Sequence, residues 1–114
     1  MQPPASNAVD VHKAKELIEA GAVRVVDVRT QFRFPAMPGA EYIALEDILA
    51  RPREVLPKGK PILFICNVGQ TSGVATQMAL ALGTTKVYNM EGGMEAWAKA
   101  GYATEAPPQP YPPR

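Results

Sequence analysis

The apolar positions along the chain follow two patterns, one with helical spacing and one of short continuous runs. Helical spacing first appears between Asp10, a good N-cap, and Gly21, which would end the segment. The apolar face of this predicted helix carries Val11, Ala14, Leu17 and Ile18. By contrast, residues 23–28 form a short, mostly apolar run that is rich in β-branched residues and predicts a buried strand. Residues 62–65 are apolar without interruption, which is typical of a strand covered on both faces.

The rest of the chain continues this alternation. We expect a long loop, a short helix, a turn, a buried helix that is apolar nearly all round, a third strand and a last short helix. These elements span residues 29–40, 44–50, 52–56, 72–82, 86–88 and 94–99, in that order. Alternating helices and strands predict an α/β domain with a mostly parallel central sheet.

Proline marks both ends of the chain. Seven of the twelve prolines lie near the termini, where the missing backbone donor keeps them out of helix and sheet interiors. We therefore expect extended tails over residues 1–7 and 106–114 and a single folded domain over residues 8–105. A polyproline ligand in the second tail is the alternative to a solvated end.

Composition and charge narrow the range of functions. The chain has 114 residues and a net charge of +1, with its Lys and Arg residues scattered rather than clustered. Nucleic-acid and anionic membrane surfaces usually carry a basic cluster, so neither partner is expected. No apolar run approaches the roughly 20 residues of a membrane span, and the polar start resembles no signal peptide. A cytoplasmic protein is the resulting expectation.

The chain has one cysteine, Cys66, and one histidine, His12. An internal disulfide is therefore impossible, and a zinc site cannot be assembled from these two residues. Acidic residues are not clustered either, so we expect no metal and no cofactor. His12, on the first helix, is expected to be solvated and to take no part as a general base.

The segment from Cys66 to Ser72 carries the candidate chemistry because it joins a predicted buried strand to a predicted helix. Such junctions lie at the carboxyl ends of parallel strands, where open α/β sheets bind their ligands. Gly69 permits a tight turn that aims backbone N–H groups inward, and the helix start adds partial positive charge. This cradle would stabilise a thiolate or a bound anion. We therefore predict Cys66 as the nucleophile and six loop residues as its substrate site: Asn67, Val68, Gly69, Gln70, Thr71 and Ser72.

Four short motifs in this order resemble those of rhodanese-like domains. They are Asp27-Val28-Arg29, Met37-Pro38-Gly39-Ala40 followed by Ile43, Cys66-x-x-Gly69-x-Thr71-Ser72, and Gly92-Gly93-Met94-Glu95-Ala96-Trp97. The resemblance implies a sheet of about five strands flanked by helices. It also implies a sulfurtransferase: the Cys66 thiolate takes a sulfane sulfur from a donor such as thiosulfate, becomes a persulfide, and passes the sulfur to cyanide or a thiol.

The chain departs from the family pattern in two places. Thr71 stands where many relatives have an Arg, and here the loop looks like that of some single-domain thiosulfate sulfurtransferases. Pro35-Ala36 replaces the usual Gly-His of the entrance loop. Thr71 and Ser72 are candidates to donate hydroxyl hydrogen bonds to the persulfide, while Ser72 can also cap the helix that follows.

Several residues have two interpretations, and for Asp27 both are structural. Asp27 either hydrogen-bonds the active-site loop or a neighbouring turn, or forms an ion pair with Arg29. Arg29 and Arg33 are the nearest basic candidates for steering an anionic donor, but a solvated surface role is expected for both. Met94 and Trp97 are expected to pack in the core.

Two other functions compete with sulfur transfer. A cysteine phosphatase or arsenate reductase would need an Arg a few residues after the cysteine to clamp an oxyanion. No Arg occurs between Arg53 and Arg114, and no second cysteine is present to resolve an intermediate. A non-enzymatic interaction module or protein-bound sulfur carrier is the other alternative, and a dedicated protein acceptor remains compatible with the retained Cys66.

Overall fold

A computed structural model describes residues 7–108 of the chain and places five parallel strands at its centre. The strands are β1 (Ala8–Val9), β2 (Arg24–Asp27), β3 (Glu41–Tyr42), β4 (Ile62–Ile65) and β5 (Val87–Met90), in the order β1-β5-β4-β2-β3. β4 is therefore hydrogen-bonded along both edges, and the residue that follows it lies at the middle of the sheet's carboxyl edge. The parallel sheet confirms the predicted fold class.

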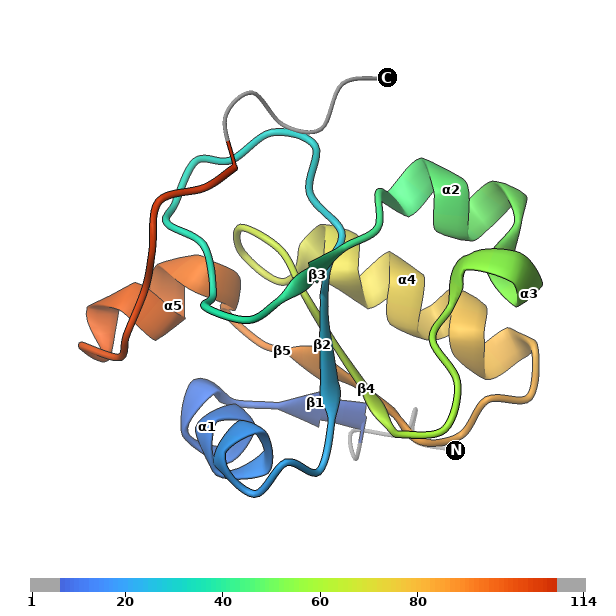
Figure 1. Cartoon of the computed structure of the whole chain (residues 1–114), viewed down its shortest axis with the longest axis horizontal. Helices are drawn as coiled ribbons and strands as arrows, with labels where there is room; N and C mark the ends of the chain where they lie inside the picture. Colours follow the sequence, from blue (N-terminus) through green and yellow to red (C-terminus); the bar gives the residue numbers. More distant parts are fainter. Residues whose placement is uncertain (1–6, 109–114) are drawn as a thin grey trace.

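Within residues 7–108, five helices cover the two faces of the sheet. They are α1 (Val11–Glu19), α2 (Leu45–Ala50), α3 (Pro52–Val55), α4 (Gln70–Ala81) and α5 (Gly93–Lys99). Figure 1 shows α1 and α5 on one side of the sheet, and α2, α3 and α4 on the other. Asp10 caps α1 as predicted, because its side chain accepts a hydrogen bond from the Lys13 amide at 2.8 Å.

Alternate residues of β4 divide the core between these two faces. Leu63 and Ile65 pack in a cluster with Trp97 and Met94 of α5, so the predicted core role of those two residues is confirmed. Ile62 and Phe64 point the other way, into a cluster with residues of α2 and α4. Because both faces of β4 are covered, its four residues are all buried, as a continuous apolar run requires.

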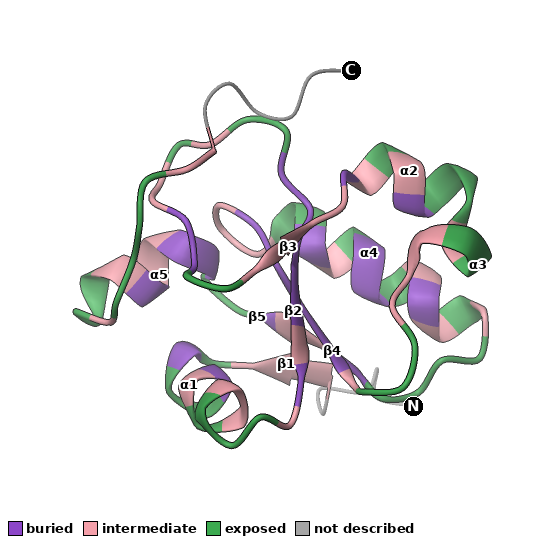
Figure 2. Cartoon of the chain, in the orientation of Figure 1, coloured by how far each residue is buried: buried purple, intermediate pink, exposed green. Residues whose placement is uncertain are grey.

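The prediction that the fourth helix is buried nearly all round is wrong. Figure 2 shows alternating buried and exposed positions along α4, and Val74 is 47% exposed. The inward stripe consists of Ser72, Ala75, Thr76 and Ala79. The sequence was misleading because Ala and Gly score as apolar although their exposure costs little. The helix also begins at Gln70 rather than at Ser72, since Gly69 adopts a left-handed conformation and acts as the N-cap.

Three strands differ from the expected ones. The two edge strands, β1 and β3, were not predicted, and the inner strand β5 is longer at its end than predicted. β3 is absent from the predicted elements, and it pairs with β2 through the registers Val26 to Glu41 and Asp27 to Tyr42. β5 extends beyond the predicted end at residue 88, because Phe64 pairs with Asn89 and Val9 pairs with Met90. This extension places the side chain of Asn89 beside α4.

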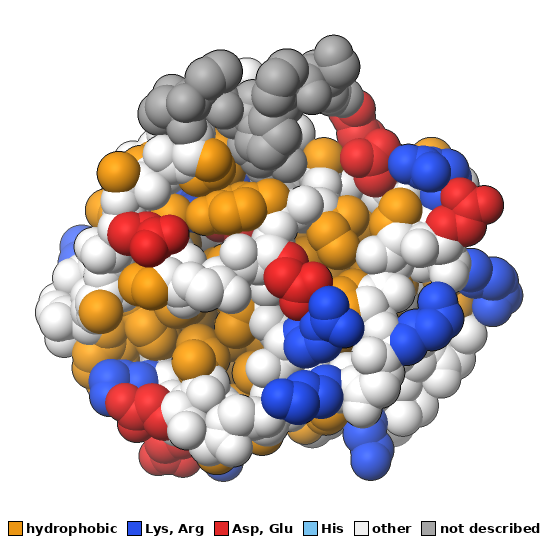
Figure 3. Space-filling model, in the orientation of Figure 1, with side chains coloured by type: hydrophobic (Ala, Val, Ile, Leu, Met, Phe, Trp, Pro, Cys, Tyr) orange, Lys and Arg blue, Asp and Glu red, His pale blue; other side chains and the backbone are white. Residues whose placement is uncertain are grey.

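The predicted tails, residues 1–7 and 106–114, fall mostly outside the described residues. Asn7 is described, and its side chain donates a hydrogen bond to the Val87 carbonyl at 2.8 Å. Within residues 7–108 no helix is both long and apolar enough to cross a membrane. On the face in Figure 3, acidic side chains lie beside basic ones. One ion pair of the sheet joins Arg24 to Glu41 at 2.7 Å.

Candidate active site

Cys66 is the first residue after β4, at the position that the sequence predicts. Its Sγ atom accepts hydrogen bonds from the backbone amides of Gly69, at 3.1 Å, and Ser72, at 3.2 Å. The Ser72 hydroxyl lies 3.2 Å from the same sulfur. Cys66 is only 2% exposed, so these three groups surround a sulfur that is almost completely shielded from solvent. The expected cradle of inward N–H groups is thus present, with two amides in contact with the sulfur.

Gly69 makes this turn possible. Its φ of +96° lies in the left-handed region, which a residue with a side chain rarely adopts. A Cβ atom at this position would also lie 3.1 Å from the Gly92 nitrogen and 3.3 Å from the Met90 carbonyl oxygen. The turn therefore needs glycine both for its backbone conformation and for its close approach to the segment after β5.

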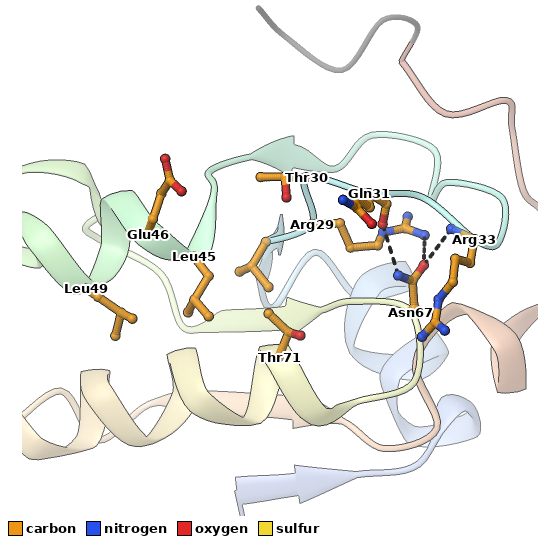
Figure 4. A pocket seen from close by; sticks show the side chains of 10 residues that line it. Arg29, Thr30, Gln31, Arg33, Leu45, Glu46, Leu49, Asn67 and Thr71 are labelled. Atoms are coloured by element: carbon orange, nitrogen blue, oxygen red, sulfur yellow. Dashed lines mark hydrogen bonds between the residues drawn. The ribbon is translucent and has the colours of Figure 1, made fainter. Parts of the chain in front are cut away.

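One flank of the loop, which we call the β2 flank, is made by Asp27, Arg29, Asn67 and the loop over residues 31–33. Arg29 forms an ion pair with Asp27 at 2.6 Å, and both side chains are almost completely buried. Its Nη1 group also donates to the Asn67 side-chain oxygen at 3.0 Å. Asn67 in turn accepts from the Arg33 amide and donates to the Gln31 carbonyl, both at 3.0 Å, as Figure 4 shows.

The β2 flank settles two of the alternatives left open by the sequence. The ion pair of Asp27 with Arg29 exists, and Asp27 also accepts a hydrogen bond from the Arg29 backbone amide at 3.0 Å, in the turn after β2, so both structural roles of Asp27 are present. The prediction that Arg29 is solvated is wrong, because this residue is only 3% exposed. Its guanidinium donates hydrogen bonds to the side chains of Asp27 and Asn67 and to the backbone carbonyls of Phe34 and Pro35. Arg33 is exposed, as expected.

The opposite flank, which we call the β5 flank, is made by Ser72, Asn89 and the start of α5. The Ser72 hydroxyl donates to the Asn89 side-chain oxygen at 2.5 Å, and the Asn89 amide donates to the Gly69 carbonyl at 3.1 Å. Asn89 was missed by the sequence analysis. Its only signal is that it is a polar residue directly after a predicted strand, and this is too common to identify a site.

The start of α5 holds the Cys66 loop through two backbone hydrogen bonds. The Met94 amide donates to the Cys66 carbonyl at 2.9 Å, and the Glu95 amide donates to the Asn67 carbonyl at 3.0 Å. These first-turn amides have no acceptor within their own helix, so the loop carbonyls satisfy them. Gly93 allows the contact, because a Cβ atom there would lie 2.5 Å from the Asn67 carbonyl group.

A pocket of about 480 Å³ lies beside the loop, between α2, α4 and the segment after β2 (Figure 4). Its lining combines polar and apolar side chains from Val28, Arg29, Thr30, Gln31, Arg33, Leu45, Glu46, Leu49, Asn67 and Thr71. Asn67 and Thr71 are the two predicted loop residues that reach this pocket. Ser72 is instead turned inward against the sulfur, while Val68 and Gln70 make no hydrogen bond to the sulfur within residues 7–108.

Two groups of the neighbouring strands β2 and β3, Arg24 and Tyr42, have shifted pKa values. Burial, and next the charge of Asp27, raises the pKa of Tyr42 above its usual value, while Arg29 opposes this rise. The hydrogen bond with Glu41 raises the pKa of Arg24. Tyr42 therefore stays neutral and Arg24 stays charged at neutral pH.

His12 is exposed, as expected, and its ring contacts the Tyr102 hydroxyl at 2.5 Å.

Comparisons with known proteins agree with this geometry. Residues 10–100 match the model of the rhodanese-like domain family. The chain is 31% identical to the protein HIGH ARSENIC CONTENT 1, mitochondrial, from Arabidopsis thaliana, over 89% of this chain and 67% of that protein. It is 29% identical to the thiosulfate sulfurtransferase GlpE of Vibrio cholerae, over 86% and 93% of the two chains.

A solved structure is similar as well. The rhodanese homologue of Thermus thermophilus superimposes with a TM-score of 0.68 and 35% sequence identity, over 78% of this chain and 98% of that one. The family match therefore spans strands β2 to β5 and the Cys66 loop.

Proposed function

The chain belongs to the rhodanese-like domain family, and on that premise we propose that it is a sulfurtransferase with Cys66 as its sulfur-carrying nucleophile. The observation that carries the proposal is the Cys66 sulfur itself, which is held by the Gly69 and Ser72 amides beside the Ser72 hydroxyl. Hydrogen-bond donors aimed at a sulfur stabilise the negative charge that it carries as a nucleophile and regains as a leaving group. The similarity to GlpE supports the same chemistry.

The proposed reaction has two balanced steps. In the first, the Cys66 thiolate attacks the outer sulfur of thiosulfate, the sulfur–sulfur bond of thiosulfate breaks, and sulfite leaves with the electron pair. In the second, cyanide or a thiolate attacks the outer sulfur of the Cys66 persulfide, and the Cys66 thiolate leaves. No cofactor takes part. We further propose that both steps occur in the cytoplasm, where thiol acceptors are kept reduced.

The pocket beside the loop is the proposed entry site for the donor. Asn67 and Thr71 line it from the loop that covers the sulfur, and Arg33 adds an exposed cation at its edge. We expect thiosulfate to meet this cation and the start of α4, whose free amides attract anions. Val68, Gly69 and Gln70 are expected to contribute backbone amides rather than side chains.

The arrangement favours sulfur transfer over oxyanion chemistry. A phosphatase or arsenate reductase needs a guanidinium that can close on a tetrahedral oxyanion. Thr71 stands in the loop where such an Arg would be, and Arg29 is already bonded to Asp27 and Asn67. The second candidate function, a protein-bound sulfur carrier, uses the same persulfide but accepts sulfur only from a protein donor.

Intact-mass measurement after incubation with thiosulfate tests the proposal. We expect the wild-type mass to rise by one sulfur atom, and cyanide to remove that atom while thiocyanate forms. Cys66→Ser should lose both events. Ser72→Ala changes the same loop but keeps the thiol, so it is the matched control that separates loss of the thiol from the effect of a substitution in the loop. If the wild-type protein stays unmodified in excess thiosulfate but takes up sulfur from a protein persulfide, the proposed enzyme function would be wrong and the sulfur-carrier function would take its place.

A further inference from the structure

Asn89 holds its side-chain amide in one orientation between two partners of the β5 flank. Its nitrogen lies 3.1 Å from the Gly69 carbonyl oxygen, and its oxygen lies 2.5 Å from the Ser72 hydroxyl oxygen. The Gly69 carbonyl can only accept a hydrogen bond, so the amide nitrogen must face it. The amide oxygen must consequently face Ser72.

This orientation decides which way the Ser72 hydroxyl points. A serine hydroxyl has a single hydrogen, whereas an amide oxygen has none to offer. The hydrogen between Ser72 and Asn89 is therefore the serine's own. Ser72 then presents a lone pair to the Cys66 sulfur, which lies 3.2 Å from its oxygen. In this arrangement the Cys66 thiol donates its hydrogen to Ser72.

We propose that Asn89 is a positioning residue that sets the cost of forming the Cys66 thiolate by competing with the sulfur for the Ser72 hydroxyl. When the thiol loses its proton to solvent, the Ser72 lone pair faces a negative sulfur. The hydroxyl can relieve this repulsion by turning to the sulfur, but Asn89 then loses its donor. This inference rests on the proposed function, in which the Cys66 thiolate is the attacking species.

The other groups around the sulfur do not depend on Asn89. The amides of Gly69 and Ser72 contact the sulfur directly, and they can do so in either protonation state. α4 carries no charged side chain. Charged side chains on the neighbouring elements include Asp27, Arg29 and Arg33 on the β2 flank. They also include Glu46 and Asp47 of α2, of which Glu46 lines the pocket, and Glu91 and Glu95 around the start of α5. They are the same in every variant described next, so they do not produce differences between variants.

Two substitutions at Asn89 separate this role from simple support of the loop. Asn89→Leu and Asn89→Asp both remove the amide nitrogen that holds the Gly69 carbonyl. Leu also removes the acceptor of the Ser72 hydroxyl, which becomes free to donate to the sulfur. Asp keeps that acceptor and brings a carboxyl group close to the sulfur. A purely structural role predicts the same kind of damage from both changes.

The measurement is the rate of Cys66 alkylation by iodoacetamide as a function of pH, followed by intact mass. For Asn89→Leu we expect the midpoint of the profile to move about one pH unit lower, the size of one gained charge-assisted hydrogen bond. For Asn89→Asp we expect it to move higher. Asn89→Ala repeats the Leu experiment with a smaller side chain if the Leu variant does not fold.

The control removes the hydroxyl through which Asn89 acts. In a Ser72→Ala background, adding Asn89→Leu should leave the midpoint unchanged. Midpoints that move in the same direction for Leu and Asp, or a Leu shift that persists without the hydroxyl, would overturn the inference. Alkylation requires no sulfur donor, so these results do not depend on thiosulfate loading. Opposite shifts in a protein that thiosulfate never loads would refute only the proposed function.

Discussion

The two flanks of the Cys66 loop hold it by different chemistry. On the β2 flank a buried ion pair, Asp27 with Arg29, reaches the loop through Asn67. On the β5 flank the contacts are neutral: the Asn89 amide, the Ser72 hydroxyl and the backbone of Gly93. A buried charge is expensive when its partner is lost, whereas a neutral group costs less. Damage to the β2 flank should therefore appear as lost stability, and damage to the β5 flank more as altered chemistry at the sulfur.

The largest expected effect comes from Arg29→Met. This change leaves the buried Asp27 carboxylate without its ion-pair partner, and Asn67 without one of its donors. We expect the free energy of unfolding, measured by urea denaturation, to fall by about 3–5 kcal/mol. For comparison, Asn89→Leu on the β5 flank leaves only the neutral Gly69 carbonyl without its donor, so it should lower the free energy of unfolding by about 1–3 kcal/mol.

A double variant checks the cause of that loss. Adding Asp27→Asn to Arg29→Met removes the unpaired carboxylate while keeping its shape, so a large part of the lost stability should return. If the double variant is as unstable as the sum of the two single variants, the flank is held by packing rather than by charge.

A smaller effect is expected from Gly93→Ala, which pushes the start of α5 away from the loop. The new Cβ atom would lie 2.5 Å from the Asn67 carbonyl carbon and oxygen, at a φ of +61°. Gly83→Ala is the matched control, because its φ is +91° but nothing lies within 4 Å of the new atom. The control should cost about 1–2 kcal/mol of unfolding free energy for the backbone conformation alone.

Gly93→Ala should cost about 1–3 kcal/mol more than this control, and it should also slow sulfur loading. Equal losses of stability in the two variants, with loading unchanged, would show that the close approach of α5 to the loop is not needed.

The sequence predicts the central features of this site because they depend on local pattern. An apolar run followed by cysteine and then by Gly69 places Cys66, the proposed nucleophile, at a strand end, and the structure has this cysteine there. The two flanks could not be predicted in the same way. Arg29 is buried because the chain around Phe34 and Pro35 folds back over it, a contact that no sequence spacing indicates.

β3 and Asn89 escaped prediction for related reasons. β3 is only two residues long, Glu41 and Tyr42, so it shows no periodicity, and its existence depends on pairing with β2. The position of Asn89 depends on the register of β5. This strand continues beyond the apolar residues from which it can be predicted. Both features depend on which strands become neighbours, and this is a property of the whole sheet.

The smallest expected effect concerns the end of the chain, next to the β2 flank. Glu105 and Ala36 exchange two backbone hydrogen bonds, at 2.8 and 2.9 Å, which tie the chain after α5 to the loop that follows Arg29. Deleting residues 107–114 keeps both bonds. Turnover should then stay within about twofold of wild type and the unfolding free energy within about 0.5 kcal/mol, as for most surface changes.

Deleting residues 105–114 is the matched comparison, because it differs only in removing Glu105 and Ala106. It eliminates both bonds to Ala36, each of which contributes about 0.5–1.5 kcal/mol. The loop would then be held by Arg29 and Asn67 with less support from outside, so thiosulfate loading should slow as stability falls. If the shorter deletion is already as damaging as the longer one, the proline-rich end has a role in the site beyond its bridge to Ala36. Equal, near-wild-type behaviour of both would show that the ion pair alone is enough to hold the β2 flank.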